Sequence, residues 1–233
     1  KYVKDQQVTA KQPTQTEVVD AAQDGKWKFK GYEPASPVTV GTEDVKFVGK
    51  WEFIADEHNV SYEFVSGTAG KELPQAVKDL LPTDANKYKK DQQVTAIQPA
   101  QTEVEVAAED GKWVFKGYEP ASPVTVGTED VKFVGKWEFK ANEHNVSYEF
   151  ASGTAGKDLP QAVKDLLPTD AAKYVKGAQV NAVQPAQAEV EDAAQDGKWV
   201  FKGYEPASPV TVGTEDVKFV GKWEFVAKEH NAT

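Results

Sequence analysis

The chain has 233 residues, a net charge of −10 and 39% hydrophobic residues. Its aromatic content of 11% exceeds that of disordered chains, and no apolar run approaches the roughly 20 residues that a membrane-spanning helix needs. The absence of cysteine excludes disulfides, thiol catalysis and thiolate metal sites. All 27 basic residues are lysines, so the chain has no arginine guanidinium group to donate paired hydrogen bonds to phosphate or guanine. We therefore expect no nucleic-acid partner.

A repeat of 86 residues organises the sequence. The segment GKWVFKGYEPASPVTVGTEDVKFVGKWEF at residues 111–139 recurs unchanged at 197–225, and at 25–53 it differs only in having Lys28. The three histidines keep the same interval, since 144 minus 58 and 230 minus 144 are both 86: His58, His144 and His230. A unit of this length can form its own core, because domains of about 55–65 residues often fold alone. The sequence therefore predicts one domain type in tandem.

The repeat predicts the domain boundaries. These are an incomplete repeat at 1–58, complete repeats at 59–144 and 145–230, and the start of another at 231–233. The first copy lacks the equivalent of 59–86, and if nothing fills that gap it exposes an apolar face and an unpaired strand edge. Periodicity alone also permits a frame that starts at Lys1 and leaves 173–233 as the incomplete unit.

The first part of the complete repeat predicts a strand followed by a helix. Apolar and polar residues alternate over 60–65, which is typical of a half-buried strand, and 66–70 supply a flexible turn. Residues 73–81 then predict a helix of two to three turns, with Pro74 in its first turn and Pro82 ending it. Its apolar side chains have helical spacing: Leu73, Val77, Leu80 and Leu81. Such a short helix needs a sheet to pack on.

The rest of the repeat predicts short strands. They cover 94–97, 103–107, 112–118, 124–126 and a longest strand at 131–139. Asp110-Gly111 predicts a hairpin turn in which the glycine takes the positive φ. The element order predicts an α+β unit, mainly an antiparallel sheet with one short helix on a face. The joints between copies contain neither glycine nor proline, which favours a stiff, elongated rod.

Several motifs resemble the SHIRT domain, the streptococcal high identity repeats in tandem. They are Tyr62-Glu-Phe64-Val-Ser-Gly-Thr68, Lys71-Glu-Leu73-Pro74, Leu80-Leu81-Pro82 and Trp137-Glu-Phe139, and the resemblance covers both complete copies and the partial one. It implies stalk repeats of a Gram-positive, cell-wall-anchored surface adhesin, in which repeat number sets how far a distal binding domain projects. The implied partners are the neighbouring repeats and that distal domain, and the implied state is a monomer at the cell surface. The frame that starts near Asn59 depends partly on this resemblance.

The sequence predicts no catalytic, cofactor or metal site. One histidine per copy cannot form a zinc site, which needs three or four converging ligands, so we expect a joint-stabilising or solvated histidine. Glu57-His58 lacks an accompanying nucleophile. Glu129-Asp130 lies in a turn without the spacing of a calcium loop. We therefore predict that the chain is not an enzyme.

Three further features leave alternatives open. Sequons begin at Asn59, Asn145 and Asn231, and are without meaning in a bacterial protein. An internal Lys–Asn isopeptide bond would need a buried lysine and an acid beside Asn59 or Asn145. Tyr88 and Tyr118 lie next to predicted loops and could contact a glycan instead of framing the core. The sequence thus leaves three hypotheses: a rigid spacer, a repeat that binds a host glycan or protein, and an enzyme. For the enzyme, the sequence offers no set of catalytic residues.

Overall fold

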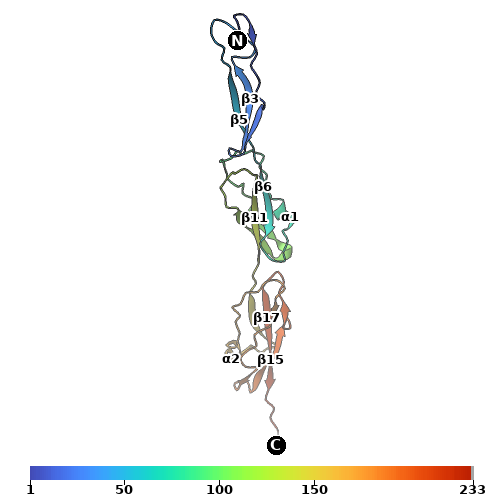
Figure 1. Ribbon diagram of the computed structural model, residues 1–233. Helices are drawn as coiled ribbons and strands as arrows, with labels where there is room; N and C mark the ends of the chain where they lie inside the picture. Colours follow the sequence, from blue (N-terminus) through green and yellow to red (C-terminus); the bar gives the residue numbers. More distant parts are fainter. Residues whose placement is uncertain (232–233) are drawn as a thin grey trace. The chain divides into compact units, whose positions relative to one another are not determined.

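The computed structural model describes residues 1–231 (Figure 1). The chain divides into two compact units. The first unit comprises 1–102 and 114–138, and the second comprises 103–113 and the chain from 139 onward. The division falls inside residues 59–144, so it does not coincide with the predicted repeat boundaries. Within the described part of the chain, no helix is long and apolar enough to cross a membrane.

The first unit begins with residues 1–58, for which the sequence predicts an incomplete repeat. Its antiparallel sheet has the order β2 (Glu17–Asp20), β3 (Gly25–Glu33), β5 (Val48–Ala55), so β5 is an edge strand (Figure 1). A separate two-stranded ribbon joins β1 (Gln7–Val8) to β4 (Val38–Thr39).

The first unit continues with most of the second repeat. Its elements are β6 (Val60–Ser66), α1 (Gln75–Lys78), β7 (Gln93–Val94), β10 (Val124–Thr125) and most of β11 (Val131–Ala141). β6 and β11 pair in parallel, and the register runs from Val60 opposite Val131 to Ser66 opposite Trp137. One buried cluster of this part comprises Val60, Val94, Ala96, Val126, Val131 and Phe133.

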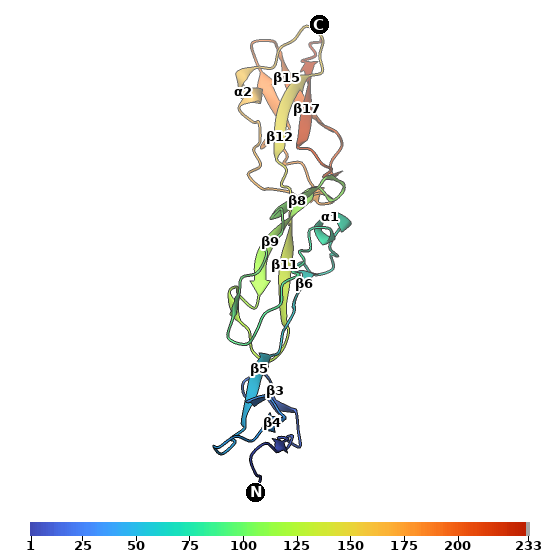
Figure 2. The same cartoon turned by 90° about the horizontal axis from the view of Figure 1, so that it is seen from above.

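The second unit contains the third repeat entire. Its sheet has the order β12 (Val146–Ser152), β17 (Val217–Ala227), β15 (Gly197–Glu205), β14 (Glu189–Asp192). Figure 2 labels the first three of these strands. β12 is parallel to β17, whereas the other pairs are antiparallel. β13 (Gln179–Val180) pairs with β16 (Val210–Thr211), and α2 (Gln161–Lys164) is the helix. β8 (Glu103–Val106), a 3₁₀ turn (Ala107–Glu109) and the start of β9 (Gly111–Glu119) also belong to this unit.

The α+β prediction is confirmed: each complete repeat of about 86 residues carries mostly antiparallel strands and one short helix. The parallel pair was not predicted, because alternation of apolar and polar residues specifies which face is buried but not the direction of the partner strand. The strand at 60–65 and the longest strand at 131–139 were predicted correctly to within two residues. The strand at 94–97 was too long, since β7 covers only Gln93–Val94.

The helix is shorter than predicted. α1 covers Gln75–Lys78 rather than 73–81, and Pro74 precedes the helix in extended backbone. Leu73 and Val77 are buried as expected, but Leu81 is 42% exposed. A single turn is sufficient because tertiary packing of Val77, which is fully buried, replaces the stability that helix length would provide.

The hairpin turn also differs from the prediction. Asp110 takes the left-handed conformation, with φ of 55°, while Gly111 begins β9 and is buried. A Cβ on Gly111 would lie 2.5 Å from the Lys140 carbonyl oxygen and 2.5 Å from Cζ of Phe139. The glycine is therefore required for close packing rather than for turn geometry, and aspartate is one of the few other residues that adopt the left-handed region.

Close packing at another glycine gives a testable prediction. A Cβ on Gly135 would lie 2.7 Å from the Phe64 ring, whereas nothing lies within 4 Å of the Cβ position of Gly127. Gly135→Ala should lower the free energy of unfolding of the second repeat by about 1–3 kcal/mol through overpacking. Native-state hydrogen exchange at the amides of β6 and β11 measures this change. Gly127→Ala is the control and should stay within about 0.5 kcal/mol of wild type; similar effects of the two variants would contradict the packing argument.

Candidate functional site: the histidine clasp

A histidine follows the last strand of one repeat and precedes the first strand of the next. His58 lies between β5 and β6, with Nε2 2.7 Å from Oδ2 of Asp24 and Nδ1 3.8 Å from Oδ1 of Asp130. Asp24 belongs to residues 1–58 and Asp130 to residues 59–144. His58 and Asp24 are 8% and 7% exposed, so their contact is shielded from water. We call these three residues, together with Tyr88, the histidine clasp.

The backbone completes the clasp. The N–H of His58 donates to the carbonyl of Tyr88 at 2.7 Å, and the N–H of Tyr88 donates to the carbonyl of His58 at 3.0 Å. Lys90 Nζ also donates to the carbonyl of Ala22, at 2.6 Å. Residues on both sides of the joint are therefore hydrogen-bonded to each other by main chain and by side chain.

Local structure places both carboxylates. Asp24 adopts a positive φ of 57°, and its carbonyl accepts from the N–H of Asp56 at 2.9 Å, which holds the turn against the end of β5. The parallel register of β6 and β11 puts the residues before these strands side by side. Accordingly, Asn59 donates to Asp130 from its N–H at 2.7 Å and from Nδ2 at 3.1 Å.

The second unit contains the same arrangement. His144 Nε2 lies 2.6 Å from Oδ2 of Asp110, and Nδ1 lies 3.8 Å from Oδ1 of Asp216. The reciprocal backbone bonds run between His144 and Tyr174, at 2.7 and 3.0 Å. Asn142 Nδ2 also donates to Oδ1 of Asp110, at 3.0 Å. The His, Asp and Tyr contacts of the two clasps are thus equivalent, whereas the Asn142 contact belongs to the second clasp, since the equivalent residue 56 is aspartate.

The third histidine shows which residues form the His–Asp contact and which residues bury it. His230 Nε2 lies 2.6 Å from Oδ2 of Asp196, although these side chains are 66% and 60% exposed. The His–Asp contact therefore forms within one repeat. At His58 and His144, residues of the following repeat bury it.

Hydrogen bonds in the clasps lower the pKa of several aspartate side chains. The hydrogen bond to His144, followed by that from Asn142, lowers the pKa of Asp110. The backbone amide of Asn59, followed by its side chain, lowers the pKa of Asp130, and Asn145 does the same for Asp216. These carboxylates are held in the ionised form. Among residues 1–231, no group of three or more His, Asp or Glu side chains could hold a metal ion.

The isopeptide candidates lie together but lack the required environment. Lys87 Nζ donates to Oδ1 of Asn59, and Asn59 Nδ2 donates to Asp130. However, Lys87 and Asn59 are exposed, and the side chain of Asp130 is 59% exposed. Isopeptide formation needs a lysine buried together with an acid, because burial favours the neutral amine that attacks the amide. The trio therefore acts as a hydrogen-bonded extension of the clasp, and the same holds for Lys173 with Asn145.

The remaining sequence candidates have structural contacts. The Tyr88 hydroxyl donates to Oδ2 of Asp84 at 2.8 Å, and that of Tyr118 donates to the carbonyl of Ile97 at 2.9 Å. Burial raises the pKa of Tyr118 to about 12. Glu57 is exposed, and Glu129 lies in an exposed turn. Thr233, the last residue of the third sequon and of the predicted segment 231–233, lies outside the described residues.

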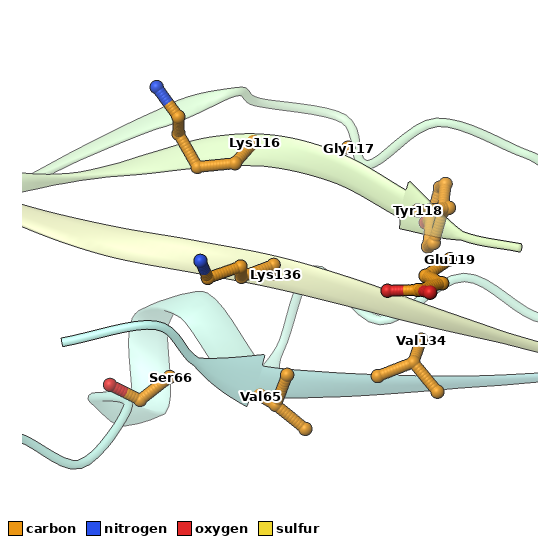
Figure 3. A pocket seen from close by; sticks show the side chains of 8 residues that line it. All are labelled: Val65, Ser66, Lys116, Gly117, Tyr118, Glu119, Val134 and Lys136. Carbon is orange, nitrogen blue, oxygen red and sulfur yellow. The ribbon is translucent and has the colours of Figure 1, made fainter. Parts of the chain in front are cut away.

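A shallow groove of about 450 Å³ lies on strands β6, β9 and β11 (Figure 3). It is lined by Val65, Ser66, Lys116, Gly117, Tyr118, Glu119, Val134 and Lys136. In the third repeat, Ala151 stands at the position of Val65. Lys136 is ion-paired with Glu138 at 2.9 Å, and Glu119 adds a carboxylate to the lining, so Lys116 is the lysine of the groove most suited to a weak contact with an aromatic group.

The spacing of the sequence points to the histidine but not to its partner. His58 and Asp24 are 34 residues apart, as are His144 and Asp110. A signal was present: an aspartate recurs at 24, 110 and 196, while the residue before it is Gln23, Glu109 or Gln195. An invariant charge beside a variable neighbour marks a position with a specific contact.

The lowered pKa of Asp110 gives a pH prediction. Its folded-state pKa lies below the unfolded value of about 3.9, so the contact stabilises the chain above that pH and the stabilisation is lost as pH falls through the folded pKa. The Tm of wild type should therefore fall more steeply than that of Asp110→Asn as pH decreases from about 5 to about 2. Calorimetry of both variants measures this. Glu143→Gln, at an exposed neighbouring position, should follow wild type; parallel curves for wild type and Asp110→Asn would contradict the clasp.

Comparison with known proteins identifies the repeat. The family model described as SHIRT domain matches residues 1–54, 56–140 and 142–226. A solved structure of streptococcal SHIRT domains 3–4 from a cell surface protein is 44% identical, with a TM-score of 0.51, and the match covers 72% of this chain and 98% of that one. The search of curated proteins gave no match.

Two single-domain structures also match. Streptococcal SHIRT domain 10 from a cell surface protein is 54% identical over 36% of this chain and 99% of its own, with a TM-score of 0.34. SHIRT domain 2 is 48% identical over 35% and 93%, with a TM-score of 0.25. The three successive matches to the family model, which together cover nearly the whole sequence, establish that this chain belongs to the SHIRT domain family.

Proposed function

We propose that the chain is a spacer: stalk repeats of a bacterial surface adhesin that is anchored to the cell wall in the full-length protein and holds a distal binding domain away from the cell. Its repeats are 59–144 and 145–230, preceded by the incomplete copy at 1–58, and it acts as a monomer without catalytic activity. The relationship to SHIRT domains of a streptococcal cell surface protein supports the surface location.

The observation that carries this proposal is the recurrence of the histidine clasp. A flexible tether would need no specific contacts at its joints, whereas both joints here combine a buried His–Asp contact with reciprocal backbone hydrogen bonds. The connecting residues 56–59 and 142–145 are also few, so the last strand of one repeat runs almost directly into the first strand of the next. Each contact restricts rotation at the joint.

The expected length per repeat follows from the longest strand. β11 has 11 residues, and a strand rises about 3.3 Å per residue, so each repeat should add about 35 Å to the length if the strands continue along one axis. A spacer of this kind lengthens linearly with repeat number.

Distance measurements between spin labels test the proposal. The chain has no cysteine, so cysteines introduced in pairs at the exposed positions Thr42, Thr128 and Thr214 can be labelled specifically. These positions are equivalent in the three copies. Pulsed electron paramagnetic resonance should give narrow distance distributions for both neighbouring pairs, with equal means, because equivalent clasps hold both joints.

His144→Ala is the matched variant. It removes one clasp, so the distribution between Thr128 and Thr214 should broaden while that between Thr42 and Thr128, which spans the His58 clasp, stays narrow. Broad distributions at both joints of the wild-type chain would refute the spacer.

The alternative is a repeat that itself binds a host glycan or protein. The groove beside Lys116 favours it, because this lysine lies next to the apolar side chains of Val65 and Val134. Tyr118 is a poor test position, since its ring packs against Tyr62 and Phe115 and its replacement would disturb the core. Saturable binding of the full chain on a glycan or matrix-protein array, abolished by Lys116→Glu and Lys202→Glu without loss of folding, would support this alternative. A spacer gives no saturable binding.

A further inference from the structure

Each buried histidine lies between two carboxylates that come from different repeats. Nε2 of His58 is 2.7 Å from Asp24, which precedes it in residues 1–58, and Nδ1 is 3.8 Å from Asp130 of the following repeat. The corresponding distances at His144 are 2.6 Å and 3.8 Å. One ring nitrogen therefore makes a hydrogen bond, whereas the other lies too far from its carboxylate for one.

The short contact identifies the nitrogen that carries the proton of a neutral ring. The hydrogen bonds from His144 and Asn142 lower the pKa of Asp110, so this carboxylate is ionised and can only accept. Nε2 of His144 must then be the donor. Because a neutral imidazole has a single N–H, its Nδ1 presents a lone pair to Asp216. The lone pair and the carboxylate oxygen repel each other, which accounts for the longer distance on this side.

Protonation changes what the ring can bind. An imidazolium has two N–H donors, so it can donate to both carboxylates at once. The carboxylate on the Nδ1 side is held ionised, since the backbone amide of Asn59, followed by its side chain, lowers the pKa of Asp130. Asn145 does the same for Asp216. This acceptor is therefore available in mildly acidic solution, where an imidazole in water gains its second proton.

The other charged groups around the first clasp bind elsewhere. Lys87 Nζ donates to Asn59 and Lys90 Nζ to the carbonyl of Ala22, the Tyr88 hydroxyl donates to Asp84, and Asp56 and Glu57 are exposed. The second clasp has equivalent groups, with Asn142 in place of Asp56. Side chains of lysine, aspartate and glutamate ordinarily keep their charges between about pH 5.5 and 8, so histidine is the side chain that changes charge in this range. The carboxylates face the ring nitrogens directly, so their attraction for an imidazolium outweighs repulsion from the lysines.

We propose that protonation of His58 and His144 stiffens the joints, because the charged ring binds carboxylates of both repeats while the neutral ring binds only that of its own repeat. This inference rests on the proposed spacer function. Asp24 and Asp110 tie the neutral ring to the preceding repeat. The added N–H donor links the same ring to the next repeat. The spacer is then stiffest in mildly acidic surroundings, and this stiffening is lost as pH rises and the imidazolium gives up its proton.

Pulsed electron paramagnetic resonance at two pH values tests the inference. Spin labels on cysteines at the equivalent exposed positions Gln15, Gln101 and Gln187 avoid the turns that hold the clasp aspartates. Both neighbouring pairs should give narrower distance distributions at about pH 5.5 than at about pH 8. The population outside the main peak should fall about twofold to fivefold, the ratio expected for an ion pair that water reaches from one side.

Two variants of the first clasp remove the response in different ways. Asp130→Asn replaces the carboxylate on the Nδ1 side by a neutral group of similar size. His58→Gln keeps a donor for Asp24 but takes up no proton in this range. In both variants the distribution between Gln15 and Gln101 should no longer change with pH, and circular dichroism checks that each variant is folded.

Two controls should keep the response. The pair Gln101 and Gln187 spans the unchanged second clasp, so in the same variants it should still give the narrower distribution at the lower pH. Glu129→Gln removes an exposed carboxylate next to Asp130 and should behave as wild type at the first joint.

Nitrogen-15 NMR of the histidine rings measures the proton positions directly. At about pH 8 the rings of His58 and His144 should carry their proton on Nε2, and at about pH 5.5 both nitrogens should be protonated. A proton on Nδ1 at the higher pH would contradict the inference, because the ring would then already donate toward the next repeat.

Three results of the distance measurements would also overturn the inference. They are equal widths at the two pH values, broader distributions at the lower pH, and a response at the first joint that both Asp130→Asn and His58→Gln retain. Equal widths that are narrow leave the spacer function intact, whereas equal widths that are broad refute the spacer as well. The two failures are therefore distinguishable.

Discussion

The parallel pairing of the first and last strands of a repeat is the constraint on which the rest of the structure depends. It closes the core, because β6 brings Tyr62 and Phe64 against the aromatic residues of β11. It also fixes the joint, since the register that sets Val60 opposite Val131 places Asn59 against Asp130 one position earlier. His58 precedes Asn59 and is thereby brought near the same carboxylate. One pairing therefore determines both how a repeat folds and where its neighbour is held.

The sequence predicted the features that depend on local pattern. Alternation located β6 and β11 because each strand has one buried face, and internal repetition gave the unit length. The sequence did not predict contacts between residues that are far apart in the chain. Alternation does not specify that β6 lies parallel to β11. The partner of each buried histidine is 34 residues away, beyond the reach of a local pattern. The helix was overestimated because Leu80 and Leu81 follow helical spacing, although the chain leaves the helix after Lys78. At Asp110-Gly111 the turn was located correctly but the left-handed residue was not, because the glycine is needed for packing.

Tyr118 and Lys87 show that a side chain whose sequence position suggests a binding or chemical role does not necessarily have the surroundings for it. Tyr118 lies beside a loop, yet its hydroxyl is hydrogen-bonded and its ring is part of the aromatic core. Lys87 lies near an asparagine and an aspartate, yet it is too exposed for amide chemistry. Both cases illustrate that the chemistry of a side chain is set by its surroundings, which composition and spacing do not describe.

The exposed His230–Asp196 contact has a consequence for how such a protein changes over generations. Both side chains of this contact belong to one repeat, so each copy carries its own half of the joint. Every internal joint draws on the same residues, so insertion or loss of a whole copy preserves all the remaining contacts. Gain or loss of a copy would then change the number of repeats in whole steps.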